Sequence, residues 1–255
     1  MKTSERLWDP ILNPDENFGD DIPMLHSYLP EIRKGDGAVI IFTGGAYARR
    51  APHEAEPYAL KLNEMGIAAF VVDYRVKPSM PHLPATDAIR AMCTVRERAE
   101  EYKINPKKIA VMGSSAGGHL AAYCSCYNPV QKANAQILCY PVTDIESHKG
   151  SYENLLGENL NLSEEISPIA LAKEDTPPTF IWHTSSDSSV DVKGTYRYAT
   201  RLSELGVPVE MHIYPVGGHG LGLANGLYGR DTEVYVQRWI DDLEHWLKLI
   251  GWISE

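Results

Sequence analysis

The chain has 255 residues, 44% of them hydrophobic and 23% charged, a composition that is ordinary for a globular protein. α/β proteins of this length commonly form one domain, and we expect residues 1–255 to do so. A net charge of −10, from 24 Lys and Arg against 34 Asp and Glu, argues against nucleic acid or an anionic membrane as a partner. The charge does not exclude a neutral small molecule or oligosaccharide as the partner, nor the assembly of the chain into a homo-oligomer.

The start of the chain contains no apolar stretch typical of an export signal, and no apolar run approaches the length of a membrane-spanning helix. We therefore expect a cytoplasmic location. The cysteines lack zinc-type spacing, and in a cytoplasmic protein we expect them to be buried, reduced thiols. They are Cys93, Cys124, Cys126 and Cys139.

Short apolar runs alternate with amphipathic stretches from about residue 37 onward. Runs that are apolar throughout are typical of strands buried on both faces, whereas the alternating run 209–214 suits a strand nearer the sheet edge. Apolar residues at intervals of three and four predict helices between the strands. The predicted strands are 38–42, 67–72, 109–112, 137–140, 179–182 and 209–214. The predicted helices include 55–65, 88–102, 195–205 and 236–247, the last with Asp231 as its N-cap.

Two segments interrupt this alternation. Residues 1–36 are rich in Pro and Asp, and only 22–29 has the pattern of an edge strand in this N-terminal extension. Residues 145–178 contain polar loop residues and a short helical pattern near 162–171, and we expect them to form a small, partial cap. The rest predicts an α/β fold with a mainly parallel sheet and helices on both faces.

The segment Val111-Met112-Gly113-Ser114-Ser115-Ala116-Gly117 is a short apolar run that ends in Gly-x-Ser-x-Gly before a helical stretch. A serine at such a strand-to-helix turn exposes its hydroxyl at the end of the sheet, and the glycines avoid a Cβ clash. The N–H groups that begin the helix favour negative charge. Ser115 is therefore the candidate nucleophile, although the five-residue pattern alone also fits an ordinary glycine-rich turn.

A serine nucleophile needs a base within hydrogen-bond reach. In this order of strands the acid and then the histidine follow the serine along the chain. His219 lies between glycines directly after the last predicted strand, whereas His212 is inside that strand and His245 is inside the last helix. We therefore predict His219 as the base.

The base needs a third group to orient it, and a carboxylate after a late strand can do so. Asp187 follows the predicted strand that precedes the histidine strand, which makes it the candidate acid. Asp144 is the second candidate, and Asp191 is better explained as the cap of the next helix. The alternative to a catalytic role is that Asp187 is a carboxylate on a loop, exposed to solvent.

The residues Thr43-Gly44-Gly45-Ala46-Tyr47 follow the first core strand. The backbone N–H groups of Gly45 and Ala46, with that of Ala116, are predicted to form an oxyanion hole. Tyr47 and Trp182 are tentative pocket residues, with packing in the core as an equal alternative. We expect His119 to be a contact between helix and sheet rather than a second base, and His183 to satisfy local hydrogen bonds. No residues show metal-ligand spacing or a phosphate-binding loop, so we expect no metal and no cofactor.

In combination these motifs resemble the α/β-hydrolase superfamily, and within its serine esterases the branch that contains acetyl xylan and feruloyl esterases. The matching segments are 42–47, 72–75, 111–121, 140–144, 175–180 and 217–220. They follow the family's order and span about residues 37–250. Thr43 departs from the pattern, because related sequences usually carry His or Pro there. The predicted donors are backbone groups, so the departure concerns the support of the hole rather than the donors themselves.

The chemistry of these residues predicts a serine carboxylic-ester hydrolase that works through an acyl-enzyme. A modest cap favours a short acyl group such as acetate, and the resemblance implies a carbohydrate, such as a xylan-type oligosaccharide, as the alcohol. An amide-cleaving relative, either an aryl formamidase or a peptidase, is one alternative, since the same residues serve acyl transfer generally. A hydrolase-fold binding protein without activity is another.

Overall fold

The computed structural model describes residues 2–8, 21–77, 82–127 and 132–254, and within them the chain forms an eight-stranded sheet. The strands lie in the order β1-β2-β4-β3-β5-β6-β7-β8. The six from β3 to β8 run parallel, while β1 and β2 are antiparallel to their neighbours. This mainly parallel sheet confirms the predicted fold class. The strands are β1 (Lys2–Arg6), β2 (Met24–Tyr28), β3 (Ala38–Phe42), β4 (Ala68–Asp73), β5 (Ile109–Ser114), β6 (Ala135–Cys139), β7 (Thr179–Thr184) and β8 (Val209–Tyr214).

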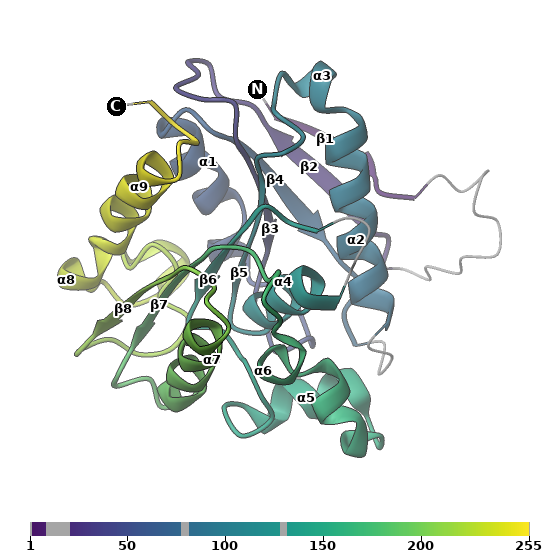
Figure 1. Ribbon diagram of the computed structural model, residues 1–255, viewed down its shortest axis with the longest axis vertical. Coiled ribbons are helices and arrows are strands. Elements are labelled where there is room, and N and C mark those ends of the chain that lie inside the picture. Colours follow the sequence, from purple (N-terminus) through teal and green to yellow (C-terminus); the bar gives the residue numbers. More distant parts are fainter. Residues whose placement is uncertain (1, 9–20, 78–81, 128–131, 255) are drawn as a thin grey trace.

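Helices cover both faces of the sheet (Figure 1). On one face lie α1 (Glu56–Glu64), α8 (Val234–Gln237) and α9 (Trp239–Leu249); on the other lie α2 (His82–Glu97), α3 (Ala99–Tyr102), α4 (Ala116–Tyr127) and α7 (Val192–Glu204). Successive side chains of a strand point to opposite faces. In β3, Ile40 and Phe42 therefore join one hydrophobic cluster, while Val39 and Ile41 join the other. Burial on both sides explains why the central strands are apolar throughout.

The prediction is correct for one edge of the sheet and wrong for the other. The alternating strand 209–214 does form the edge strand β8. The predicted edge strand at 22–29 contains β2, but β2 is second from the edge, because β1 pairs with it and was not predicted. The sequence of β1 is polar and its side chains are largely exposed, so the backbone ladder to β2 holds it rather than an apolar face.

Two helix predictions need correction. The periodic stretch 88–102 is interrupted at Arg98, where α2 gives way to the short α3. Asp231 is not an N-cap, because α8 begins at Val234 and α9 begins separately at Trp239. Asp191 does cap α7, since its side chain accepts a hydrogen bond from the N–H of Lys193.

The insertion at 145–178 consists of α5 (Lys149–Leu156), a 3-10 helix η2 (Leu160–Ile166) and α6 (Pro168–Leu171). The helical pattern predicted near 162–171 thus corresponds to η2 and α6, whereas α5 was not predicted. Asn154 on α5 donates its side-chain amide to the carbonyl of Ala46 at 2.8 Å. The insertion is therefore attached directly to the loop that follows β3.

The four cysteines are free thiols, as predicted. Cys124, Cys126 and Cys139 are buried, whereas Cys93 is only partly buried. Across the described segments we find no helix with the length and apolar character that crossing a bilayer requires.

Candidate active site

Ser115 lies at a sharp turn between the end of β5 and the start of α4. Its φ of 54° places it in the left-handed region, which is strained for a residue with a side chain. The turn needs its glycines: a Cβ on Gly113 would lie 2.1 Å from the carbonyl oxygen of Gly117, and one on Gly117 would lie 2.1 Å from that of Phe42. The local sequence thus holds the Ser115 hydroxyl at the carboxyl end of the sheet.

The structure brings Ser115, His219 and Asp187 together in one hydrogen-bonded chain, although they follow three different strands. His219 Nε2 is 2.9 Å from Ser115 Oγ, and His219 Nδ1 is 2.7 Å from Asp187 Oδ2. A carboxylate only accepts hydrogen bonds, so the Nδ1–H of His219 donates to Asp187. Nε2 of the neutral ring is then the acceptor for the hydroxyl of Ser115. This is the arrangement in which a histidine can remove a proton from serine.

Asp187 is held by four donors. Its Oδ1 accepts from the N–H groups of Ser189 at 2.8 Å and Val190 at 3.0 Å. Its Oδ2 accepts from His219 and also from Nε2 of His183 at 3.1 Å. Burial alone would raise the pKa of Asp187, but the hydrogen bonds from His183 and His219 outweigh it and hold the pKa well below its usual range. Asp187 is therefore an ionised, fixed partner for His219.

His183 contributes more than the sequence indicated. We expected it to satisfy local hydrogen bonds, and its Nδ1 does accept from the hydroxyl of Thr195 at 2.8 Å. That bond leaves the proton on Nε2, which donates to Asp187. One signal in the sequence could have indicated this role: His183 lies near the end of β7, four residues before Asp187.

The two other candidate acids lie elsewhere. Asp144 contacts no histidine among the described residues; it accepts from Arg197 Nε at 2.8 Å and from the N–H of Ser147 at 2.7 Å. These bonds give Asp144 a structural role in the loop after β6. Asp191 caps α7, as described above.

The loop after β3 turns through three successive residues with positive φ: Gly45 at 126°, Ala46 at 54° and Tyr47 at 58°. Within the described segments, the N–H groups of Gly45, Ala46 and Ala116 have no protein acceptor. Gly45 and Ala46 line the same cavity as Ser115. Unpaired N–H groups beside a nucleophile are suited to bind a developing oxyanion. The Tyr74 hydroxyl supports the loop from below by donating to the carbonyl of Thr43 at 2.6 Å.

A buried carboxylate that the sequence analysis missed, Glu54, lies beneath this loop. Its side chain is 3% exposed. It accepts from the N–H of Gly44 at 2.6 Å and from the hydroxyl of Tyr140 at 2.7 Å, with His53 Nε2 at 3.4 Å. Burial alone would raise the pKa of Glu54, but hydrogen bonding and charge attraction from His53, with the bonds from Tyr140 and Gly44, lower it. The group is therefore a carboxylate.

The Glu54 network also reaches the loop that carries His219. Nε2 of His53 donates to the carbonyl of Gly220 at 2.9 Å, and the Tyr140 hydroxyl accepts from the N–H of Gly222 at 3.0 Å. The Tyr140 ring lies edge-on to the His219 ring, with centroids 5.2 Å apart. Glu54 thus connects the loop after β3, which contains Gly45 and Ala46 (the oxyanion loop), to the loop that carries His219 (the histidine loop). No motif in the sequence marks it, because two of its three partners, Gly44 and Tyr140, lie in other segments of the chain.

The expectation that Tyr47 and Trp182 line the pocket is not met. Tyr47 is 1% exposed, because its positive φ turns the side chain into the core, where its hydroxyl bonds Nδ1 of His119 at 2.6 Å. Trp182 is 0% exposed and stacks on Trp239 at 5.0 Å, because its position in β7 faces α9. Both residues take the alternative role of core packing.

His119 is a buried histidine rather than a second base, as expected, but its hydrogen bonds run to the loop after β3 and to the insertion instead of to the sheet. Its Nε2 donates to the carbonyl of Ile166 at 2.9 Å, and Nδ1 accepts from the Tyr47 hydroxyl. Burial lowers the pKa of His119 to about 4, so the ring is neutral at physiological pH. It cannot serve as a second base for Ser115 while both nitrogens are engaged.

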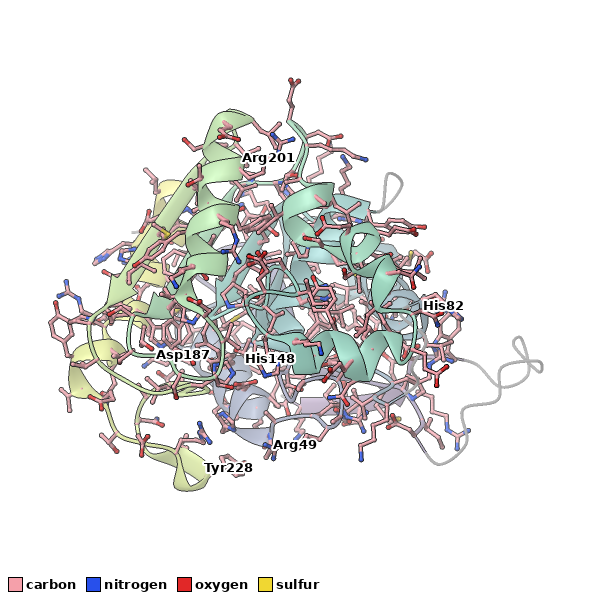
Figure 2. The ribbon with its side chains drawn as sticks, turned by 90° about the horizontal axis from the view of Figure 1, so that it is seen from below. Arg49, His82, His148, Asp187, Arg201 and Tyr228 are labelled. Atoms are coloured by element: carbon pink, nitrogen blue, oxygen red, sulfur yellow. The ribbon has the colours of Figure 1, made fainter. Side chains whose placement is uncertain are left out.

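Ser115 opens into a cavity of about 290 Å³. Besides the oxyanion loop and His219, the wall includes Arg49, His148 and Arg230, none of which the sequence analysis singled out. In Figure 2, His148 lies near the middle of the view with Asp187 to its left and Arg49 below them, while Arg201 near the top and His82 at the right lie away from this group. No group of side chains in the described segments is arranged to hold a metal ion.

A larger cavity of about 710 Å³ lies between α1, the loop around Tyr228 and helices α8 and α9. Neither Ser115, Asp187 nor His219 lines it. The hydrogen-bonded chain, rather than cavity size, therefore locates the candidate site.

The chain is similar to known ester hydrolases in sequence and in fold. The chain is 39% identical to an acetyl ester-xyloside bifunctional hydrolase from Caldicellulosiruptor lactoaceticus, with a TM-score of 0.87 over 99% of this chain and 97% of that one. It is 32% identical to an acetylxylan esterase of Xylanibacter ruminicola over 92% of this chain and 50% of the relative. It is 33% identical to endo-1,4-beta-xylanase B of Butyrivibrio fibrisolvens over 87% of this chain and 38% of the relative.

The chain thus spans half or less of the length of these two curated relatives. The model of the BD-FAE family matches residues 25–202, which contain Ser115 and Asp187, and the eight-stranded sheet of the described segments aligns closely with a solved ester hydrolase. The protein belongs to the BD-FAE family of α/β hydrolases.

Proposed function

We propose that the protein is a serine carboxylic-ester hydrolase that acts through an acyl-enzyme. Ser115 is the nucleophile, His219 the general base and acid, and Asp187 the residue that orients His219. The single observation that carries this proposal is the continuous hydrogen-bonded chain from Ser115 Oγ through His219 to Asp187.

The reaction follows from the geometry. As Ser115 Oγ attacks the ester carbonyl carbon, its proton passes to Nε2 of His219, and Asp187 stabilises the imidazolium that forms. The negative charge on the carbonyl oxygen is bound by the N–H groups of Gly45, Ala46 and Ala116. His219 then gives its proton to the leaving alcohol oxygen, and the C–O bond breaks. Water then attacks the acyl carbon as His219 takes its proton, the bond between that carbon and Ser115 Oγ breaks, and His219 returns the proton to Oγ as the acid leaves.

We propose acetyl or another short acyl group on a carbohydrate, such as a xylan-type oligosaccharide, as the substrate. Support comes from the names of the relatives, which include an acetylxylan esterase and an acetyl ester-xyloside hydrolase. The cavity at Ser115, about 290 Å³, suits a small acyl group with part of an alcohol. A cytoplasmic location, which stays a prediction, would make imported oligosaccharides the natural substrate.

Two alternatives remain for comparison. An amide-cleaving enzyme would use the same residues, and relative kcat/KM values on acetyl sugars, aryl formamides and aminoacyl amides separate it from an esterase. A binding protein without activity is disfavoured because the Ser115–His219–Asp187 chain is intact. Reaction of the folded protein with a fluorophosphonate tests for that alternative.

The direct test is the release of acetate from acetylated xylo-oligosaccharides by the wild-type protein and by Ser115→Ala. We expect release by the wild type and background rates for the variant. Ser203→Ala, at a serine on α7, is the matched control and should retain wild-type activity. Full activity in Ser115→Ala would refute the proposal.

A further inference from the structure

The wall of the Ser115 cavity carries positive charge in a protein whose net charge is −10. Arg49 and Arg230 both line this cavity. Among the described residues that line it, Glu54 is the one carboxylate; it is 3% exposed and its two oxygens accept from Gly44 and Tyr140. Two guanidinium groups, against one carboxylate that is nearly fully buried and hydrogen-bonded, leave an excess of positive charge on the accessible wall. Such a wall attracts an anionic group, although the surface as a whole would repel it.

Arg230 is a fixed charge beside the histidine loop. Its Nε donates to the carbonyl of Gly220 at 2.7 Å, and its Nη2 donates to the carbonyl of His219. No carboxylate pairs with it among the described residues. Carbonyl oxygens orient a guanidinium without neutralising it. The acidic residues that follow in the chain, Asp231 and Glu233, lie near Gly218 and Gly217 and do not line the cavity.

Arg49 is a second charge, at the end of the oxyanion loop. It is exposed, and in the described part of the chain its guanidinium forms no ion pair. Arg50 provides a comparison, because it pairs with Asp21 at 2.8 Å and lies 3.6 Å from Asp73. The two adjacent arginines thus differ. Arg50 is paired with carboxylates of the protein, whereas Arg49 lines the cavity and forms no ion pair with a described carboxylate.

His148 adds an uncharged donor to the same wall. Its Nδ1 accepts from the N–H of Ser151 at 3.0 Å, so the proton of the neutral ring is on Nε2. Within the described segments Nε2 has no protein partner. Burial, and the nearby His219, lower the pKa of His148, which keeps the ring neutral. Its Nε2–H can donate to a ligand oxygen in the cavity.

We propose that Arg49, Arg230 and His148 form an anion-binding subsite, so that the preferred substrate is an ester whose alcohol part carries a carboxylate, such as an acetylated oligosaccharide with a uronic acid. His219 protonates the leaving alcohol, so the alcohol lies on the His219 side of Ser115, where Arg230 is bound to the His219 carbonyl. Guanidinium groups suit carboxylates because they donate two parallel hydrogen bonds. This inference rests on the proposed esterase activity.

Two aryl acetates test the subsite, 4-acetoxybenzoate with a carboxylate at the far end and its neutral methyl ester, each followed by the release of acetate. They share the acetyl group and the phenolic leaving position. The measured quantity is the ratio of kcat/KM for the charged ester to that for the neutral ester. Comparing this ratio between protein variants cancels the intrinsic difference in reactivity of the two esters.

In Arg49→Gln we expect the charged-to-neutral ratio to fall about tenfold, because a charge-assisted contact made by an exposed side chain is lost. Arg49→Lys should keep part of the ratio, since it retains the charge but not the planar group. The wild-type ratio should also fall as salt concentration rises. The matched control is Arg201→Gln, on α7, whose side chain is 41% exposed and 3.7 Å from Glu204; it should leave the ratio unchanged.

The outcomes separate the two proposals. If the wild type hydrolyses neither ester, nor acetylated xylo-oligosaccharides, the proposed function fails and the subsite with it. If the wild type hydrolyses the neutral ester but Arg49→Gln leaves the charged-to-neutral ratio unchanged, the function stands and the subsite is refuted. Equal losses on both esters give that same unchanged ratio, and would show that the arginine acts on the reacting oxyanion instead. A faster reaction of acetylated xylo-oligosaccharides with a glucuronic acid branch than without it would extend the result to carbohydrate.

Discussion

Replacing Glu54 by Gln tests whether the buried network positions the oxyanion loop. The substitution keeps the size of the side chain and exchanges one carboxylate oxygen for an NH₂ group. In the wild type both oxygens accept: one from the N–H of Gly44 at 2.6 Å, the other from the hydroxyl of Tyr140 at 2.7 Å. A glutamine has one acceptor oxygen, so it cannot keep both bonds: its NH₂ group either faces the Gly44 N–H, or donates to the Tyr140 hydroxyl, which must then turn its own proton away.

The size of the effect follows from these two bonds. A hydrogen bond to a charged group contributes about 1.5–3 kcal/mol, and a buried donor left without an acceptor costs a similar amount. Complete loss of one oxyanion donor lowers kcat by about 10²–10³. Gly44 precedes the donors rather than being one of them, so we expect displacement of the loop and a loss in kcat of about 10- to 100-fold. KM should change little, because the substrate subsite is intact.

The assay combines kcat and KM for an acetyl ester with active-site titration and thermal unfolding. Titration corrects kcat for any unfolded fraction. Glu64→Gln is the matched control, because Glu64 lies on α1 with its side chain 66% exposed in a surface pair with Lys61. We expect that control to match the wild type, since such pairs contribute about 0–1 kcal/mol. A folded Glu54→Gln protein with wild-type kcat per titrated site would refute the reasoning.

Two further predictions concern a side chain in the site and one in the core. Asp187→Asn should lower kcat by about 10⁴, because an amide cannot hold His219 in the tautomer that accepts the serine proton; wild-type turnover on an acetyl ester would contradict this. His119 has a pKa of about 4 when folded and about 6.5 when unfolded, so the unfolded chain binds the proton first as pH falls. The free energy of unfolding should therefore decrease by about 2–3 kcal/mol between pH 7 and 4.5 through this group. Urea titrations of His119→Gln should show that much less dependence on pH, and an unchanged dependence would count against the buried neutral ring.

Much of the fold could be predicted from the sequence because the main signals are local. Strands such as 38–42 are apolar throughout since helices bury both faces, and Gly113 and Gly117 mark the turn at Ser115. The order of Ser115, Asp187 and His219 along the chain reflects parallel strands whose carboxyl ends share one edge. The polar strand β1 carries no such signal, because only its backbone pairing with β2 defines it.

The parts of the site that escaped prediction depend on contacts between distant segments. Glu54 gains its role from Gly44, Tyr140 and His53, and nothing in its own surroundings in the sequence indicates a buried carboxylate. Tyr47 shows the converse. Its position beside the oxyanion loop suggested a pocket residue, but the positive φ that presents the backbone to the site turns the ring into the core.

Intact-protein and peptide mass spectrometry after reaction with a fluorophosphonate gives the most direct measurement of the nucleophile. We predict one label per chain, carried by Ser115, absent in Ser115→Ala and formed much more slowly in His219→Asn. Since the Ser115 hydroxyl donates to His219 only in the folded protein, prior unfolding should abolish labelling. A folded wild-type protein that takes no label, or takes it at another residue, would contradict a nucleophilic Ser115.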